Sequence, residues 1–260
     1  MNFNLPHLPE RTTKPRQTGL TMMMDKGMSN TRTEYVIDAC SELIDFVKFG
    51  FGTSYITKNL TVKMAMYQEA DIQCYLGGTL FEAYIARGMF DDYRRLLDQL
   101  HLSVAEVSDG CIQIPQEEKL KYIEILSKDV LVLSEVGNKT TDHELTEKDW
   151  ISKMASELQA GSWKVIAEAR ESGTIGIYDS SGQAKTSMID HISEDVGNDN
   201  ILWEAPQKAQ QVWFINHFGS NVNLGNIAPD EIIPLETLRL GLRGDTFFNW
   251  LPEDAVKQYK

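Results

Sequence analysis

Eight short apolar segments alternate with helical segments along this chain, and the alternation constrains its fold more than any other feature. Each segment is rich in β-branched and apolar residues and ends in a polar or glycine-containing cluster; they cover residues 19–26, 45–50, 71–77, 102–108, 130–136, 163–169, 201–205 and 221–226. Most start about 26–38 residues apart, the length of one strand–helix unit. Strands alternating with helices predict a parallel sheet. Eight such units in 260 residues predict a single-domain α/β fold, the closed (β/α)8 barrel of the TIM type.

Amphipathic patterns fill the intervals between these strands, at residues 33–43, 80–97, 116–128, 146–160, 186–196, 207–218 and 230–242. Apolar residues recur there on one helical face, and Thr79 and Thr146 are placed to cap two of the helices. A doubly wound open sheet is the alternative, but no glycine-rich dinucleotide-binding motif follows the first strand. We expect residues 1–17 to form an arm that covers the barrel or is disordered, and residues 18–260 to form the barrel.

The acidic composition limits the partners of the chain. It has 25 Lys and Arg residues against 38 Asp and Glu, a net charge of −13, which argues against nucleic acids and anionic membrane surfaces. Three cysteines lie far apart without metal-ligand spacing, which argues against a disulfide framework or a zinc site. No apolar run reaches the roughly 18 residues of a membrane span, and the polar start does not resemble a signal peptide. We expect a cytoplasmic protein, and apolar residues on the predicted outer helices leave room for a homo-oligomer.

Charged side chains stand where most of the predicted strands end. Inside an apolar strand such groups cost several kcal/mol unless they are paired or solvated. In a barrel of this type the active site lies at the carboxyl ends of the strands. We therefore expect one polar pocket at that rim, built from Lys26, Lys48, Glu106, Glu135, Glu168, Arg170 and Glu204.

The glutamates of this set are candidate metal ligands. Mg²⁺ prefers hard oxygen ligands and usually takes one or two carboxylates together with water and substrate oxygens. We assign Glu168 and Glu204 to Mg²⁺, with Glu135 as a further candidate. Each of them could instead be a structural carboxylate that is paired with a neighbouring lysine or arginine.

Several elements are suited to an anionic substrate. Residues 77–79 are Gly-Gly-Thr at a predicted helix start, where backbone N–H groups favour phosphate, although a tight turn is the simpler interpretation. Asn223 and Asn226 close the eighth predicted strand, near the usual phosphate position of barrels. Arg243 follows on the last predicted helix, and an exposed helix face would explain it equally well. The expected substrate-binding residues are Lys26, Lys48, Gly78, Thr79, Asn223, Asn226 and Arg243.

Lys139 lies in a predicted loop after the fifth strand. A loop lysine is usually solvated surface, but a mobile lysine over a barrel mouth can act as a general acid when its pKa is lowered. The residue pattern alone leaves both interpretations open.

Sequence motifs along most of the chain resemble those of the phosphosulfolactate synthase family. They are GLTMMMDKG (19–27), FVKFGFGTS (46–54), GGTLFE (77–82), VSDG (107–110), SEVG (134–137) followed by Lys139, ARESG (169–173), EAPQKAQQ (204–211), NVNLGNIA (221–228) and LETLRLGLRGDT (235–246). The chain departs from the family pattern at Phe51, Leu76 and Ala169, which are conservative packing changes. Asn138 stands where a second lysine is frequent, and this removes one local positive charge.

The resemblance implies a TIM-like barrel and a carbon–sulfur lyase that adds sulfite to phosphoenolpyruvate with Mg²⁺, giving phosphosulfolactate on a route to coenzyme M or other sulfonates. Sulfite attacks the methylene carbon, an aci-carboxylate develops, and a general acid then protonates the carbon that carries the phosphate. The family's proposed acid matches Lys139, and we place Glu135 and Arg170 beside it in the catalytic group.

Two other functions remain open on the sequence. The barrel and Mg²⁺ could serve another lyase, or an enolase-like or aldolase-like reaction on a small phosphorylated acid. Because relatives of the family include plant heat-stress-associated proteins, a non-catalytic barrel protein is the third hypothesis. The charged strand ends argue against that one, because a scaffold gains nothing from buried unpaired charge.

Overall fold

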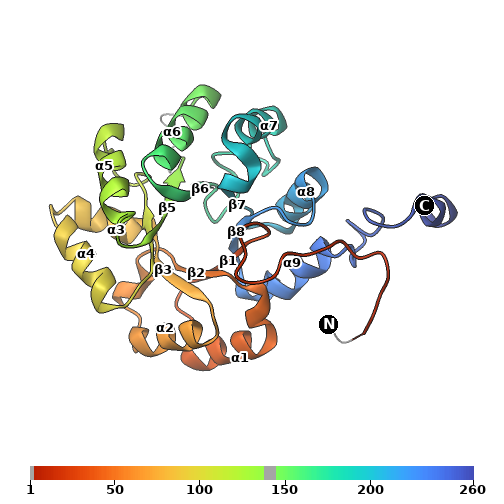
Figure 1. The fold of residues 1–260 in the computed structure, drawn as a ribbon, viewed down its shortest axis with the longest axis horizontal. Coiled ribbons are helices and arrows are strands. Elements are labelled where there is room, and N and C mark those ends of the chain that lie inside the picture. Colours follow the sequence, from red (N-terminus) through yellow and green to blue (C-terminus); the bar gives the residue numbers. More distant parts are fainter. Residues whose placement is uncertain (1–2, 138–144) are drawn as a thin grey trace.

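The computed structural model describes residues 3–137 and 145–260, which form the predicted (β/α)8 barrel (Figure 1). Every predicted strand segment overlaps an observed strand. The strands are β1 (Thr21–Asp25), β2 (Phe46–Phe49), β3 (Gln73–Leu76), β4 (Val104–Val107), β5 (Leu131–Val136), β6 (Ser162–Ala167), β7 (Ile201–Glu204) and β8 (Leu224–Ile227). Of these, β6 and β8 each extend one residue beyond the predicted segment.

The strands are parallel and follow the order β3-β2-β1-β8-β7-β6-β5-β4 around the barrel. Within the described residues no backbone ladder joins β3 to β4, although the two strands lie side by side and complete the circle. Both faces of the sheet are buried, as expected for a parallel sheet covered by helices. The barrel interior is filled by Leu20, Met22, Phe46, Tyr75, Val104, Leu133, Ile166 and Leu202, and a larger apolar core lies between strands and helices.

Helices surround the strands in a ring (Figure 1). They are α1 (Asn30–Cys40), α2 (Leu60–Glu69), α3 (Gly78–Ile85), α4 (Phe90–Gln99), α5 (Gln116–Leu126), α6 (Glu147–Gln159), α7 (Thr186–Ile192), α8 (Lys208–Phe218), α9 (Ile232–Arg239) and α10 (Glu253–Tyr259). The C-terminal helix α10 lies apart from this ring, at the end marked C (Figure 1). None of the helices in the described part of the chain combines the length and the apolar character needed to cross a bilayer.

The helix boundaries confirm some sequence expectations and correct others. Thr146 caps α6 as predicted, in a reciprocal capping box with Asp149. The single helix predicted over residues 80–97 is wrong, because the chain breaks at Gly88 (φ +67°) and forms α3 and α4. Thr79 is not a cap: Gly77 holds that position and Thr79 lies inside α3. The pattern did not predict α2 or α10.

The N-terminal arm crosses the amino-terminal end of the barrel, where the strands begin. Arg11 binds Glu236 of α9 with its Nε 2.9 Å from Oε1. Arg16 binds Asp45 (Nη1 to Oδ1, 3.0 Å), and the other oxygen of Asp45 accepts the Thr21 N–H of β1 at 2.8 Å. These ion pairs tie the arm to the start of the sheet and to α9, which it passes in Figure 1.

Arg239 closes the same end from inside. Its side chain is fully buried, and its guanidinium donates to the carbonyls of Ser220 and Val222 (both 2.7 Å) and of Leu20 (3.1 Å). A planar cation with several donors can satisfy carbonyls from two chain segments at once. Arg239 therefore holds the amino-terminal end through backbone carbonyls, and Arg11 and Arg16 add ion pairs to it.

Candidate active site

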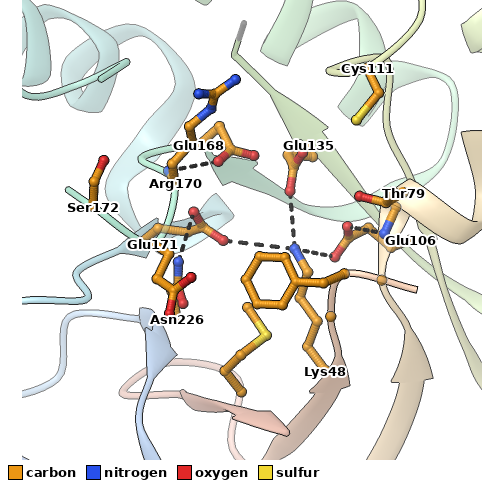
Figure 2. Close-up of a pocket in the computed structure, with 16 residues that line it drawn as sticks. Lys48, Thr79, Glu106, Cys111, Glu135, Glu168, Arg170, Glu171, Ser172 and Asn226 are labelled. Atoms are coloured by element: carbon orange, nitrogen blue, oxygen red, sulfur yellow. Dashed lines mark hydrogen bonds and ion pairs between the residues drawn. The ribbon is translucent and has the colours of Figure 1, made fainter. Parts of the chain in front are cut away.

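A cavity of about 480 Å³ opens at the opposite end, where the strands finish (Figure 2). Its walls come from the ends of most strands and from the loops that follow them. The lining residues are Met24, Lys48, Gly50, Phe51, Gly77, Gly78, Thr79, Glu106, Cys111, Glu135, Glu168, Arg170, Glu171, Ser172, Glu204 and Asn226. The predicted polar pocket thus exists at the expected rim.

Lys48 of β2 is the centre of this site. Its Nζ lies 2.9 Å from Glu106 Oε2, 3.0 Å from Glu135 Oε2 and 3.7 Å from Glu204 Oε1, so one ammonium joins β4, β5 and β7. Burial lowers the pKa of Lys48, but the three carboxylates outweigh it and hold this pKa well above its ordinary value. Lys48 therefore stays charged at neutral pH.

Glu106 also joins the site to the start of α3. Its Oε1 accepts a hydrogen bond from the Gly78 N–H at 2.5 Å. The first backbone N–H of this helix is therefore already bound to a carboxylate of the protein. A Cβ at position 78 would come within 2.3 Å of the Ser108 Cβ and 2.6 Å of Glu106 Oε1, which explains why glycine is needed. Gly78 was predicted to bind substrate; the structure shows its N–H bound to Glu106, while Thr79 lines the cavity beside it.

Glu168, directly after β6, and Glu204, the last residue of β7, are the predicted metal ligands and face the same cavity. Glu204 Oε2 accepts from the Ala169 N–H (3.1 Å) and from Asn226 Nδ2 (3.4 Å). Glu168 Oε1 accepts the Arg170 N–H at 2.6 Å. Each carboxylate is thus oriented by hydrogen bonds from the strand ends and the loops that follow them.

Two residues of this wall have left-handed backbone conformations. Arg170 has φ +55° and Asn226 has φ +58°. Asparagine tolerates this region, whereas for arginine it is uncommon, and such strain gathers at functional sites. The turn at Arg170 carries its guanidinium up the cavity wall, away from the Lys48 amine (Figure 2).

The remaining predicted substrate ligands occupy different places. Lys26 lies at the rim, where it pairs with Glu171 and its Nζ is 5.7 Å from the centre of the Phe51 ring. Asn223 precedes β8 rather than ending it, and its side chain binds the Leu20 N–H and the Ile201 carbonyl at the amino-terminal end. It therefore lies away from the cavity.

Arg243 follows α9, which ends at Arg239 on the amino-terminal side, and it is not among the residues that line the cavity. Lys139, the predicted general acid, falls outside the described residues.

Charge and donor type decide whether Mg²⁺ suits this cavity. Of the charged residues that line it in the described ranges, the acids are Glu106, Glu135, Glu168, Glu171 and Glu204, and the bases are Lys48 and Arg170. No group of three or more His, Cys, Asp or Glu side chains within residues 3–137 and 145–260 is arranged to hold a metal. Mg²⁺ needs fewer protein ligands than that, because water and substrate oxygens complete its shell. The acidic, oxygen-rich wall is chemically compatible with a divalent cation, for which Glu168 and Glu204 would be the protein ligands.

Sequence reasoning missed two buried residues behind the cavity wall. Glu82 of α3 accepts hydrogen bonds from the loop after β4. The ammonium of Lys119 of α5 donates to Asp109 Oδ1 (2.8 Å), to Glu157 Oε1 (2.8 Å) and to the carbonyl of Glu135 (2.7 Å). Both stand in helical segments, where a charged residue is normally on the solvent side. The sequence around Glu82 and Lys119 gives no indication that their side chains point inward.

Comparisons with known proteins agree with this arrangement. The family model for (2R)-phospho-3-sulfolactate synthase (ComA) matches residues 9–245. The phosphosulfolactate synthase of Bacillus subtilis is 44% identical over 252 residues, which cover 95% of this chain and 99% of that protein. The phosphosulfolactate synthase of Methanothermobacter thermautotrophicus is 42% identical, over 92% of this chain and 95% of that one.

A solved structure of 2,3-dimethylmalate lyase, a PEP mutase/isocitrate lyase superfamily member, superposes with a TM-score of 0.51 at 10% identity and covers 83% of this chain and 76% of that one. At that identity the likeness concerns the barrel fold alone. The family match and the identity to the two synthases extend over almost the whole chain, and the polar cavity lies where a barrel enzyme carries its active site. The chain therefore belongs to the phosphosulfolactate synthase family.

Proposed function

We propose that this protein adds sulfite to phosphoenolpyruvate to form 2-phospho-3-sulfolactate, with Mg²⁺ as cofactor and Lys139 as general acid. The observation that carries the proposal is the match to proteins named phosphosulfolactate synthase over more than nine-tenths of the chain. The acidic cavity at the strand ends supplies a site whose chemistry fits the reaction.

The reaction makes three demands on the site. The sulfur lone pair of sulfite forms a bond to the methylene carbon, and the electrons of the carbon–carbon double bond move toward the carboxylate. The carbon that carries the phosphate then takes a proton. The site must therefore hold two anions together, stabilise the charge that grows on the carboxylate, and deliver one proton.

The described residues support the first two demands. Lys48 and Arg170 supply positive charge at the cavity wall, and Asn226 supplies an amide beside Glu204. Phosphoenolpyruvate and sulfite are both anions, so a further cation would help the site to hold them together. Mg²⁺ held by Glu168 and Glu204 would supply that charge next to the substrate carboxylate.

Lys139 is proposed as the proton donor because it follows the SEVG motif at the position of the family's proposed acid. The contacts of Lys48 support a different role for that residue. Its ammonium is held by three carboxylates and its pKa is raised, so it is suited to holding the site together and unsuited to releasing a proton.

Phosphorus NMR tests the proposal under anaerobic conditions with phosphoenolpyruvate, sulfite and Mg²⁺. We expect a new phosphate-ester resonance that requires all three components. Lys139→Ala should slow its appearance by about 100-fold or more, the usual contribution of a general acid. Lys128→Ala, which alters an exposed lysine at the end of α5, should not change the rate. An unchanged spectrum from folded protein would exclude the sulfite reaction.

Trapping with borohydride separates this function from an aldolase-like one. A Schiff base needs a neutral amine, and the raised pKa of Lys48 keeps that amine charged. Incubation with pyruvate and borohydride should therefore leave Lys48 unmodified in a peptide mass map. A stable adduct on Lys48 would favour the aldolase-like alternative. Tight binding of phosphoenolpyruvate without turnover would favour the non-catalytic barrel.

A further inference from the structure

The loop that follows β4 is fastened to α3 through a single buried carboxylate. Glu82 is 1% exposed, and its Oε1 accepts from the Ser108 hydroxyl and from the Gly110 N–H (3.1 Å). Its Oε2 accepts from the N–H groups of Cys111 (2.6 Å) and Ile112 (3.1 Å). From the described residues alone each oxygen thus receives two donors, which fills the lone pairs of a carboxylate.

This loop forms part of the cavity wall. Cys111 lines the cavity, and the Ser108 hydroxyl lies 3.1 Å from Glu135 Oε1 as well as against Glu82. The other oxygen of Glu135 holds Lys48 at 3.0 Å. A continuous set of contacts therefore runs from Glu82 through Ser108 and Glu135 to the centre of the site.

We propose that Glu82 is a positioning residue, which shapes the wall of residues 108–112 and, through Ser108, sets the orientation of the Glu135 carboxylate toward Lys48. The role of this orientation in turnover rests on the proposed function. The fastening of the wall does not, because it follows from the hydrogen bonds alone.

The acceptor count explains why a glutamate is required. In Glu82→Gln the amide nitrogen would face two of the four donors, because an amide has one acceptor oxygen where a carboxylate has two. Buried backbone N–H groups without partners destabilise the segment that carries them. The loop of residues 108–112 would then adopt another position, and Ser108 would leave Glu135.

Cys111 provides a direct probe of this loop. It is the exposed cysteine of the three, whereas Cys40 and Cys74 are buried. The rate at which the thiol reagent DTNB modifies Cys111 therefore reports on the loop, and modification of the other two thiols, identified by peptide mass mapping, reports on global unfolding.

The test compares Glu82→Gln and Glu82→Asp with Asp45→Asn. Asp45 is a matched control, since it is also a buried carboxylate that accepts a backbone N–H, but at the amino-terminal end of the barrel. We expect Glu82→Gln to speed Cys111 modification at least fivefold and to lower kcat at least thirtyfold. Glu82→Asp keeps both acceptors and should recover part of each loss. Asp45→Asn should change both quantities less than twofold, even where it lowers the melting temperature as much.

Ser108→Ala separates the two parts of the proposal and serves also if Glu82→Gln fails to fold. It keeps the three backbone donors on Glu82, so Cys111 modification should stay within twofold while kcat falls about tenfold. Unchanged modification and kcat in Glu82→Gln would overturn the proposal, as would equal losses in Asp45→Asn. If the wild-type protein shows no sulfite reaction, the proposed function fails, whereas the modification rates still decide whether Glu82 fastens the wall.

Discussion

At the amino-terminal end of the barrel, arginine side chains bind carbonyls and single carboxylates, whereas at the carboxyl-terminal end one lysine is surrounded by three glutamates. The guanidinium of Arg239 donates hydrogen bonds to three backbone carbonyls. The ammonium of Lys48 forms ion pairs with glutamate side chains from three different strands. Both cations are buried, and they differ in their main partners: Arg239 donates to backbone carbonyls and lies only 4.0 Å (Nε to Oε2) from one carboxylate, Glu236, whereas Lys48 contacts three carboxylates.

The difference indicates that the contacts at the amino-terminal end serve stability, whereas those at the carboxyl-terminal end serve chemistry. Backbone carbonyls cannot change their charge, so the contacts of Arg239 hold the fold in one state. Carboxylates can bind a metal, a proton or a substrate-bound water in place of part of their lysine contact. An excess of them at one end therefore makes a site that a cationic or hydrogen-bonding ligand can complete, at the cost of local repulsion.

Removing the cation at the carboxyl-terminal end should have the largest effect. Lys48→Met leaves three buried carboxylates without their shared partner, so kcat/KM in the phosphorus NMR assay should fall by at least about 100-fold. Lys48→Arg keeps the charge in another shape and should restore more of the stability to urea than of the activity. Wild-type kcat/KM in Lys48→Met would show that the carboxylates, rather than the lysine, organise this end.

Removing the cation at the amino-terminal end should reverse the pattern. Arg239→Met removes the guanidinium donor from three buried carbonyls, of which Leu20 keeps the Leu224 N–H at 2.9 Å, and the free energy of unfolding in urea should fall by about 3 kcal/mol. Since the cavity lies at the other end, kcat should stay within about twofold of the wild-type value. A large loss of kcat in a variant of normal stability would contradict the separation of the two ends.

The smallest effect concerns pH. Burial lowers the pKa of Lys48, but Glu106, Glu135 and Glu204 outweigh it and raise this pKa well above normal. The folded pKa thus exceeds the unfolded one, so this charge stabilises the fold below about pH 10.4 and the contribution is lost only as pH rises through the folded pKa. NMR of carbon-13-labelled lysines should show Lys48 titrating later than exposed lysines. Titration of Lys48 in the neutral range would mean that burial lowers its pKa more than the three carboxylates raise it.

The strands were predictable because each is a short apolar run, and the carboxyl-end location of Glu135, Glu168 and Glu204 followed from barrel topology. The helix α2 was not predicted, because its inward face includes Lys63, which binds Asp25 (Nζ to Oδ2, 3.1 Å). An inward lysine removes the apolar stripe on which such a prediction depends. Thr79 and Gly88 were misjudged because propensity does not locate a helix boundary to one residue.

The sequence could predict which strands carry the site residues, but it could not predict which contacts their side chains make. A shift of the start of β8 by a few residues moved Asn223 from the cavity to the opposite end of the barrel. Glu82 could not have been selected, because its role depends on backbone N–H groups that follow 28 to 30 residues later in the chain. Which ion pairs form among many charged strand ends depends on side-chain distances that the sequence does not contain.

The seam between β3 and β4 has a mechanical consequence. Elsewhere around the described barrel, widening the cylinder means breaking a ladder of backbone hydrogen bonds. Along this seam a contact that spans the two sides is the Gly78–Glu106 hydrogen bond, which is itself part of the cavity wall. We therefore expect local opening of the cylinder to begin at the wall beside the cavity, because it can occur there while the ladders of the other strands stay intact.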